Sequence, residues 1–478
     1  MDIVGIIFIL YLVFLIGVGY KTMKFNKSQE DYLLAGRKLG PWVTAFSERA
    51  SGESAWLLLA LPGAAISVGL GEAWTVIGIT AGIIASWYLI AERLRKETEK
   101  YDALTIPEYL HRKYQDNSNV IRLFSAVIIA FFFTFYVSAQ FHASGKVINS
   151  LFGLSPVNGI TIGAAVIISY TLMGGFFAVA WTDLLQGILM IGTLVILPLA
   201  GFLELQGSEF TLSDDLLQIG ESNASFTMGR GGLAAVSVIL GGLSWGLGYL
   251  GQPHLVIRYM AIRNPIEVKK ARTIAILWAL PGITGAFLIG LVALNYFGPD
   301  YFNNVDVEQA MPLLAKELLP PIIAGLLISG AVAAMMSTAD SQLLVSTSAI
   351  TEDFIHQYLG KNMSNKALVR LSRFTIVILG LFSFGIAILS ELQEKNIFGV
   401  VSYAWSGLGS SFGPALLLSL WWPGTTRKGI VAGLLTGFLT TIIWANTELK
   451  MIVTERLVSF VFAFLMVVIV SYMDKDKT

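Results

Sequence analysis

Long apolar segments follow one another along the whole of this sequence. Each has about 20 residues, the length that a helix needs to cross a hydrocarbon core of about 30 Å at about 1.5 Å per residue. Only 13% of the 478 residues are charged, against about 25% in soluble proteins. The sequence therefore predicts an all-α integral membrane protein without a soluble domain. We expect 13 transmembrane helices, at residues 2–22, 41–67, 72–94, 121–149, 157–178, 181–204, 233–252, 271–297, 319–348, 370–391, 397–422, 428–446 and 455–473.

Basic residues are unevenly distributed between the connections. With thirteen spans, 25 of the 32 lysines and arginines, Arg258 among them, lie in alternate connections and the C-terminal tail, six lie on the other side, and Arg49 lies within a span. Because basic residues concentrate on the cytoplasmic side, we expect a multi-pass cell (inner) membrane protein with its N-terminus outside and its C-terminus cytoplasmic. The first span lacks a cationic n-region and a small-residue cleavage site, so we expect a retained helix rather than a signal peptide.

Two predicted spans contain residues that weaken a membrane helix. Span two carries SERASGESAW (Ser47–Trp56), in which Glu48, Arg49 and Glu53 together cost on the order of 8–10 kcal/mol in lipid. Span seven carries GGLSWGLGYLGQP (Gly241–Pro253), although its glycines are also typical of close helix packing. Five spans separate the two stretches, so two five-helix units would face opposite ways across the membrane. Broken helices at matching positions of an inverted repeat indicate a transporter's binding site.

Several other polar residues in the spans are candidates for ion binding. Span nine places Ala334, Ser337 and Thr338 on one helical face. Their hydroxyls could bind sodium together with unwound carbonyls, or could bond back to the i−4 carbonyl. Asp183 and Asp340 are intramembrane acids, which are functional-site candidates by default. We expect Arg49 to pair with either Glu48 or Glu53, and a gating or relay role for one acid is compatible with that pairing.

The composition argues against several other classes of function. The chain has no cysteine and a net charge of zero, which excludes disulfides and disfavours a nucleic-acid partner. It has no H-E-x-x-H or P-loop motif, and Ser244 with His254 is the only nearby nucleophile and base. We therefore predict a protein that is not an enzyme, with no obligate protein partner evident; an ion channel is a weaker alternative.

Several ordered blocks resemble the sodium/solute symporter family, and within it the sodium/proline symporters. These blocks are EDYLLAGRKLGPWVTAFS, SAWLLLALPGA, GGFFAVAWTDLLQ, SWGLGYLGQPHLVIRYMA, AAMMSTADSQLLVSTSAITED and VSYAWSGLGSSFGP. The resemblance implies a leucine-transporter-type five-plus-five inverted repeat with breaks in spans two and seven. It divides the chain into an extra helix and loop (1–39), a first repeat (40–204), a second repeat (205–422) and two final helices with a tail (423–478).

The resemblance also implies roles for individual residues. Sodium would bind at the backbone carbonyls of Ala50, Glu53 and Ala334 and the hydroxyls of Ser337 and Thr338. The lining for proline would consist of Ser54, Ala55, Trp56, Tyr136, Trp245, Tyr249 and Pro253. Asp183 resembles a sodium entry or release residue, and Asp340, Arg49 and Glu48 are further candidates for the ion pathway or coupling.

One departure from the family pattern lies in span two. The proline symporters have an aspartate important for sodium where this chain has Gly52, and Glu53 follows it in place of an apolar residue. The resemblance implies sodium-coupled uptake of L-proline by alternating access, with sodium as the only metal. The alternatives are proton coupling, because Glu53 and Asp183 could titrate, and another small carboxylate, amino acid or sugar as substrate.

Overall fold

The computed structural model describes residues 3–22, 34–173, 175–206, 211–359 and 363–475. Lys24, Lys27, Lys361 and Lys477, which contribute to the predicted charge asymmetry, lie outside these ranges. The described residues form helices and connections without a strand, and a single isolated bridge pairs Leu39 with Ile262.

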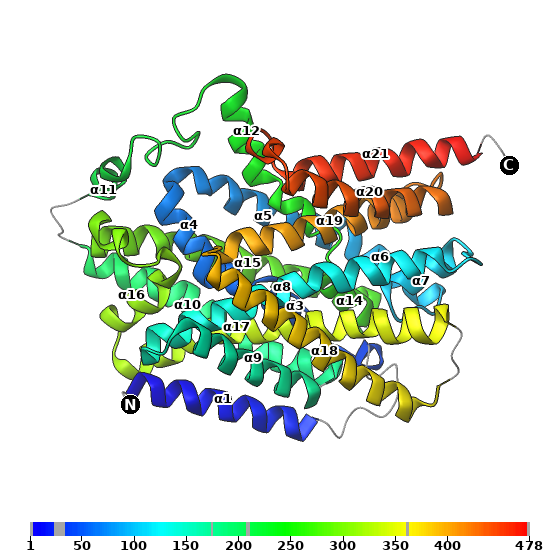
Figure 1. Cartoon of the computed structure of the whole chain (residues 1–478), viewed down its shortest axis with the longest axis horizontal. Coiled ribbons are helices and arrows are strands. Elements are labelled where there is room, and N and C mark those ends of the chain that lie inside the picture. The colour runs from blue at the N-terminus through cyan, green and yellow to red at the C-terminus, as the bar shows by residue number, and fades with distance from the viewer. Residues whose placement is uncertain (1–2, 23–33, 174, 207–210, 360–362, 476–478) are drawn as a thin grey trace.

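The long helices run side by side, and the two chain ends lie at opposite ends of the bundle (Figure 1). In chain order the α-helices are α1 (Ile3–Thr22), α3 (Pro41–Gly52), α4 (Leu61–Val68), α5 (Ala73–Ser86), α6 (Glu92–Lys100), α7 (Ile106–Lys113), α8 (Val120–Phe152), α9 (Pro156–Met173), α10 (Phe176–Glu204), α11 (Leu212–Ile219), α12 (Gly232–Leu243), α13 (Trp245–Gly248), α14 (Pro253–Ala261), α15 (Val268–Phe297), α16 (Ala310–Leu318), α17 (Pro321–Ser348), α18 (Asn365–Leu392), α19 (Ile397–Trp421), α20 (Arg427–Ala445) and α21 (Glu455–Lys475). π-helical turns η3 (Trp56–Ala60), η5 (Trp87–Ala91) and η9 (Ala349–Tyr358) join some of them.

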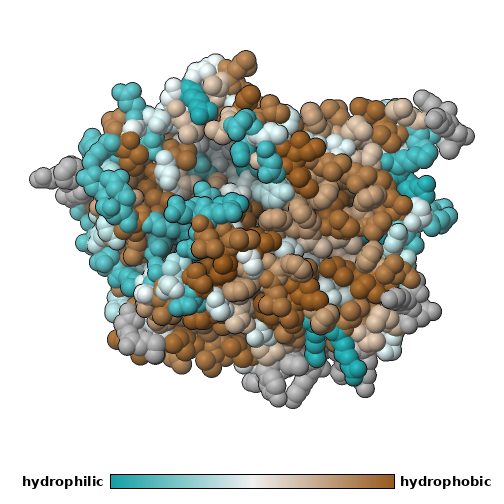
Figure 2. Space-filling model, in the orientation of Figure 1, coloured by the Kyte–Doolittle hydropathy of each residue, from teal (hydrophilic) through white to brown (hydrophobic). Residues whose placement is uncertain are grey.

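The surface of the bundle has an apolar middle and polar ends. In Figure 2, hydrophobic side chains cover much of the centre, whereas hydrophilic ones gather toward the left and right edges, where the connections lie. Large apolar side chains such as Leu203 and Phe382 are 68% and 66% exposed. A large apolar surface like this one is rare on soluble monomers but is expected where lipid is the solvent. The protein is therefore a multi-pass membrane protein.

The described residues contain fewer clear membrane spans than the predicted thirteen. Among the described residues, nine helical segments are long and apolar enough to cross a bilayer, or ten if the bent pair Gly232–Gly248 and Pro253–Ala261 is one span. In α1 only Ile3–Val18 qualifies as a shorter apolar helix, and Trp56–Lys100 counts as one segment although it turns at Gly69, where φ is 70°. The thirteen-span count is thus not confirmed and stays a prediction.

Burial distinguishes the centre of the bundle from its periphery. The apolar window of the segment that begins with α17 is 83% buried inside the protein, whereas that of α21 is only 28% buried. α17 packs against α10, α8, α1 and α3. A helix that is surrounded on all sides can present its polar side chains only to other protein groups, so α17 is where an internal polar site can form.

The backbone of α3 is interrupted near the middle of the bundle. α3 ends at Gly52, Glu53 has φ −102° and ψ 74°, and helical structure resumes at Ala55. A second interruption separates α13 from α14 with a bend of 42° between the helical axes on its two sides. Both lie within the stretches that the sequence analysis singled out.

Glycines in the second stretch allow close helix contacts. A Cβ at Gly246 would lie 2.2 Å from the carbonyl oxygen of Gly78 on α5, and one at Gly251 would lie 2.1 Å from the amide nitrogen of Gly413 on α19. No side chain fits at such distances, so α5 and α19 approach this segment because it carries glycine. Close packing therefore accounts for these glycines, alongside the bend itself.

Candidate ion and substrate site

The interruption after α3 frees backbone groups that find specific partners. The amide of Ala55 donates to Oε1 of Gln140 on α8 at 3.1 Å. The carbonyl of Gly52 accepts from the indole Nε1 of Trp56 at 3.1 Å. Non-helical backbone at membrane depth requires such partners, since lipid supplies none. Gln140 was not among the predicted site residues, and only its tertiary position reveals its role.

The predicted sodium ligands of α3 and α17 lie close together. The hydroxyl of Ser337 donates to the carbonyls of Ala50 at 2.9 Å and Ala334 at 3.1 Å, which gathers three oxygens at one point. The hydroxyl of Thr338 donates instead to the carbonyl of Ser51 at 3.0 Å. These residues are all fully buried. Among the described residues, no hydrogen bond from Ser337 or Thr338 reaches the carbonyl of Glu53, the fifth predicted ligand.

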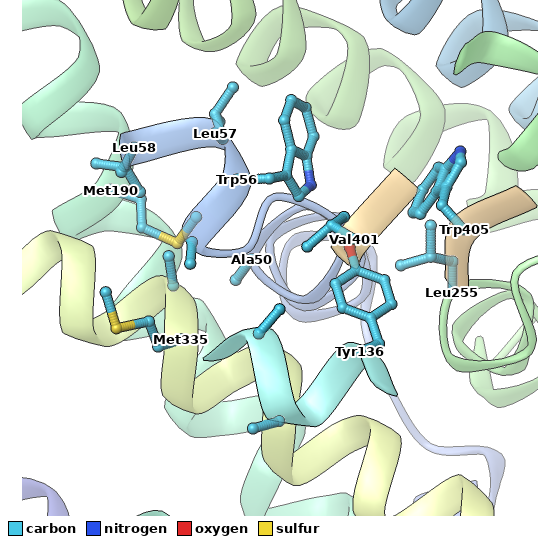
Figure 3. Close-up of a cluster of buried hydrophobic side chains, with 14 of the residues drawn as sticks. Ala50, Trp56, Leu57, Leu58, Tyr136, Met190, Leu255, Met335, Val401 and Trp405 are labelled. Atoms are coloured by element: carbon cyan, nitrogen blue, oxygen red, sulfur yellow. The ribbon is translucent and has the colours of Figure 1, made fainter. Parts of the chain in front are cut away.

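Aromatic residues pack beside the same interruption. The rings of Trp56 and Trp245 stack with centroids 6.2 Å apart, and the rings of Tyr249 and Trp405 meet edge to face at 4.7 Å. Figure 3 shows Tyr136 rising from α8 toward the segment that carries Ala50 and Trp56. The structure thus gathers residues from four separate parts of the chain around the break, and all of the aromatic ones are at most 2% exposed.

Ser54, Ala55 and Pro253, the remaining predicted lining residues, lie in three different surroundings. The Ser54 hydroxyl lies 3.5 Å from the Tyr136 hydroxyl. Ala55 is fully buried at the start of the helix that follows the break. Pro253 opens α14 and lines a separate small cavity of about 20 Å³ with Ile257. None of the aromatic residues around the break lines that cavity.

The first charged cluster, which we call the Arg49 cluster, consists of Glu48, Arg49 and Glu53. Nε of Arg49 donates to Glu48 at 2.6 Å and Nη1 donates to Glu53 at 2.7 Å, so Arg49 pairs with both acids rather than with one of them. Tyr249 donates to Glu53 at 3.1 Å. Trp87 donates to the other acid, Glu48, at 3.1 Å. All three charged side chains are fully buried.

The second charged cluster, which we call the Arg258 cluster, consists of Asp183, Arg258 and Asp340. Nη2 of Arg258 lies 3.1 Å from Oδ2 of Asp183 and donates to the hydroxyls of Ser51 at 2.6 Å and Ser341 at 2.5 Å. One oxygen of each aspartate, Oδ1 of Asp183 and Oδ2 of Asp340, has no hydrogen-bond partner among the described residues.

The burial of Arg258 corrects one expectation. The distribution of basic residues predicted Arg258 in a cytoplasmic connection, but α14 is buried throughout and the Arg258 side chain has 0% exposure. Arg258 follows His254 by four residues in an apolar stretch, and this isolated charge is the signal that could have identified it. The predicted span simply ended too early, at residue 252, because the bend conceals the continuation of the helix.

Two further residues raised by the sequence do not form a catalytic pair. The hydroxyl of Ser244 donates to the carbonyl of Gly241 at 2.7 Å. No hydrogen bond joins it to His254 in the part of the chain that the structure describes, where both ring nitrogens of His254 lack partners. The geometry therefore gives no support to an acyl-transfer site at this position.

Comparison with known proteins gives consistent results over nearly the whole chain. A sequence model of the sodium:solute symporter family matches residues 32–437. The high-affinity proline transporter PutP of Bacillus subtilis is 40% identical over 459 residues, which cover 96% of this chain and 95% of that protein. The sodium/proline symporter of Escherichia coli is 38% identical, over 98% of this chain and 92% of its own.

Solved structures with the same fold are more distant in sequence. A Na⁺-coupled sialic acid symporter, in a substrate-bound outward-open state, superposes with a TM-score of 0.81 at 18% identity, covering 99% of this chain and 98% of its own. The nucleobase-cation-symport-1 transporter Mhp1 gives a TM-score of 0.50 at 12% identity. These likenesses show the fold alone. The family match and the relatives above show more: the chain belongs to the sodium:solute symporter family, and it is a transporter rather than an enzyme.

Proposed function

We propose that this protein is a sodium/proline symporter that takes up L-proline by alternating access. The observation that carries the proposal is the contact of Ser337 with the carbonyls of Ala50 and Ala334 beside the interruption of α3. The near full-length identity to named proline transporters supports the same substrate and the same ion.

Sodium would bind where oxygens from α3 and α17 converge. It is a hard cation that binds several oxygens, and the hydroxyls of Ser337 and Thr338 already lie against carbonyls of α3. A cation there would draw the hydroxyl oxygens and the carbonyls of Ala50 and Ala334 toward itself, so it would fix the interrupted helix against α17. Ion binding would thereby order the neighbouring substrate lining, and proline would in turn strengthen ion binding.

Proline would bind among the aromatic residues around the break. The faces of Trp56, Trp245 and Tyr136 can pack against an apolar pyrrolidine ring and attract its secondary ammonium. Freed amides at the start of a half-helix can receive the carboxylate. The complete burial of these residues supports a site that is closed from both sides in this conformation.

The arrangement in the membrane is part of the proposal. We infer thirteen spans, with an outside N-terminus and a cytoplasmic C-terminus, organised as residues 1–39, 40–204, 205–422 and 423–478. The helices from α3 to α10 and those from α11 to α19 would form the two inverted halves. Sodium, L-proline and the lipid bilayer are then the only partners required for transport.

The test is uptake of radiolabelled proline into liposomes that contain the purified protein, under an inward sodium or an inward proton gradient. The proposal expects accumulation with sodium alone, and cold proline should compete better than other amino acids or sugars. Accumulation of another solute, but not of proline, would overturn the substrate assignment. A matched Ser337→Ala protein should need more sodium for the same rate.

Proton coupling is the second candidate, and the charge of the Arg49 cluster favours it. The Arg49 cluster holds two carboxylates and one guanidinium, all fully buried, so it carries a net negative charge unless one acid binds a proton. Tyr249 links Glu53 of this cluster to the aromatic lining. In Glu53→Gln liposomes, sodium-driven uptake should persist if backbone and hydroxyl oxygens suffice for coupling. Uptake driven by protons in the wild type, and abolished in Glu53→Gln, would establish the second candidate.

A further inference from the structure

Arg456, near the start of α21, contacts three different elements around the aromatic lining. Its guanidinium carbon lies 4.3 Å from the ring centroid of Trp245. Nη2 donates to the carbonyl of Gly241 at 3.3 Å, Nε lies 3.4 Å from the hydroxyl of Ser244, and Nη1 donates to the hydroxyl of Ser402 on α19. One side chain thus joins the bent segment to α19, and it comes from a helix outside the two repeats.

A large cavity open to solvent lies on the far side of this contact. Its volume is about 860 Å³, and its lining includes Ser402, Tyr403, Glu455, Lys395 and Lys450. The last two belong to the small group of basic residues that the charge asymmetry places outside the cell. The Arg456 side chain is 14% exposed. Because Arg456 contacts Trp245 on one side and Ser402 of the cavity lining on the other, it lies between the aromatic lining and a cavity that faces the extracellular side in the proposed orientation.

Phe398 completes the barrier on the same side. It lies at the start of α19, and its ring centroid is 4.7 Å from that of Trp245. Phe398 and Ser402 of α19 thus lie between Trp245 and the cavity. Arg456 connects Ser402 to the bent segment. Its forked guanidinium suits this role because its five N–H donors spread over three nitrogens in a fixed plane, whereas the three donors of a lysine all lie on one nitrogen.

We propose that Arg456 is a positioning residue that closes the outer entrance to the substrate site, by joining Ser402 of α19 to Gly241, Ser244 and Trp245. Proline can pass between the cavity and the aromatic lining only when these contacts separate. α21 therefore contributes a residue to the outer gate, although it lies at the periphery of the bundle. The transport role rests on the proposed function, whereas the closure itself does not.

Accessibility of an engineered cysteine tests the closure directly. The natural chain has no cysteine, so a single introduced thiol reports without background. Val401, the first position, lies near Tyr136 and Trp56 in Figure 3. Ile257, the second, lines the small cavity beside Thr105, in a connection that the charge asymmetry places inside. Each cysteine would be placed in the natural chain and in Arg456→Gln, reconstituted in nanodiscs, and reacted with a charged methanethiosulfonate reagent that reaches both faces.

The expected result is that Arg456→Gln raises the labelling rate at Val401→Cys about tenfold without raising the rate at Ile257→Cys. Arg456→Lys should give an intermediate increase. Arg230→Gln, which removes an exposed outer arginine elsewhere, should leave both rates unchanged. An unchanged rate at Val401→Cys would overturn the proposal, and so would equal increases at both positions, because they would indicate general loosening.

Transport assays test the part that depends on the substrate. Arg456→Gln should bind labelled proline within about twofold of the natural protein in sodium but should lose about 90% of uptake, because an entrance that stays open prevents release inside. Normal uptake with raised labelling would overturn the gating role. If the natural protein transports no proline, the proposed function fails, while the labelling result still decides the closure.

Discussion

The Arg49 cluster and the Arg258 cluster each contain two buried acids and one arginine, but their remaining partners differ. In the first, the acids also accept hydrogen bonds from the rigid groups of Trp87, Tyr249 and Tyr259. In the second, the acids accept from serine hydroxyls, and Arg258 donates to two serine hydroxyls and to the carbonyl of His254. Each aspartate retains an oxygen without a partner among the described residues.

This difference indicates different roles for two similar charge sets. An indole or a phenol held by packing donates along a fixed direction, whereas a serine hydroxyl can rotate and can either donate or accept. A fully satisfied ionic network rigidifies its surroundings. The Arg258 cluster can change partners at lower cost, and Ser51 connects it to α17 through the carbonyl of Ser337 at 3.1 Å. We therefore expect the Arg49 cluster to determine stability and the Arg258 cluster to affect ion dependence.

The largest effect is expected for Arg49→Met. This change leaves Glu48 and Glu53 buried without a cation, which should cost about 3–5 kcal/mol of unfolding free energy. Thermal unfolding in detergent would measure the loss. Adding Glu48→Gln and Glu53→Gln to the same chain should restore most of the stability. A single variant as stable as the natural protein would contradict the comparison.

Asp183→Asn should change sodium dependence without comparable unfolding. The amide keeps the size of the side chain but loses its negative charge, so the sodium concentration for half-maximal uptake should rise at least about tenfold, equivalent to about 1.4 kcal/mol. Asp215→Asn is the control, because Asp215 is also buried but bonds to Asn295 away from the site. If both variants shift the sodium dependence equally, the Arg258 cluster has no special role.

Ser337→Ala should produce a smaller shift of the same kind. Loss of one hydroxyl oxygen removes about 1 kcal/mol of interaction, or about a fivefold rise in the sodium needed for half-maximal uptake. Ser346→Ala on the same helix is the matched control, because its buried hydroxyl has no hydrogen-bond partner among the described residues. Equal behaviour of the two alanine variants would argue against the ion site at Ser337.

Tyr249→Phe and Tyr259→Phe should differ least, since only their KM for proline should distinguish them. Each removes one phenol that donates to an acid of the Arg49 cluster, so each should cost about 1–2 kcal/mol of stability. Only Tyr249 belongs to the proposed proline lining, so only Tyr249→Phe should also raise the KM for proline, by a few fold. Uptake kinetics at saturating sodium would distinguish them, and a matching rise in Tyr259→Phe would contradict the assigned lining.

Much of the architecture could be predicted because it depends on features that are local in sequence. The apolar runs predicted a helical membrane protein, and α3 ends at Gly52 within the polar stretch from Ser47 to Trp56. The spacing of Ala334, Ser337 and Thr338 placed them on one face of α17. The number of spans was harder to predict, because bends and glycine-rich helices such as α19 blur the length and hydropathy of a span.

An apolar sequence of this kind requires a backbone folded into helices, since lipid cannot satisfy exposed amides and carbonyls. It also determines that Glu48, Arg49 and Glu53 need partners, because isolated charges are costly in a membrane. Tertiary packing alone brings Trp87 and Tyr249 to those acids, joins Arg258 to Asp183, and carries Arg456 of the last helix to Trp245. Those contacts join residues tens to hundreds of positions apart, and hydropathy and helical periodicity carry information only about near neighbours.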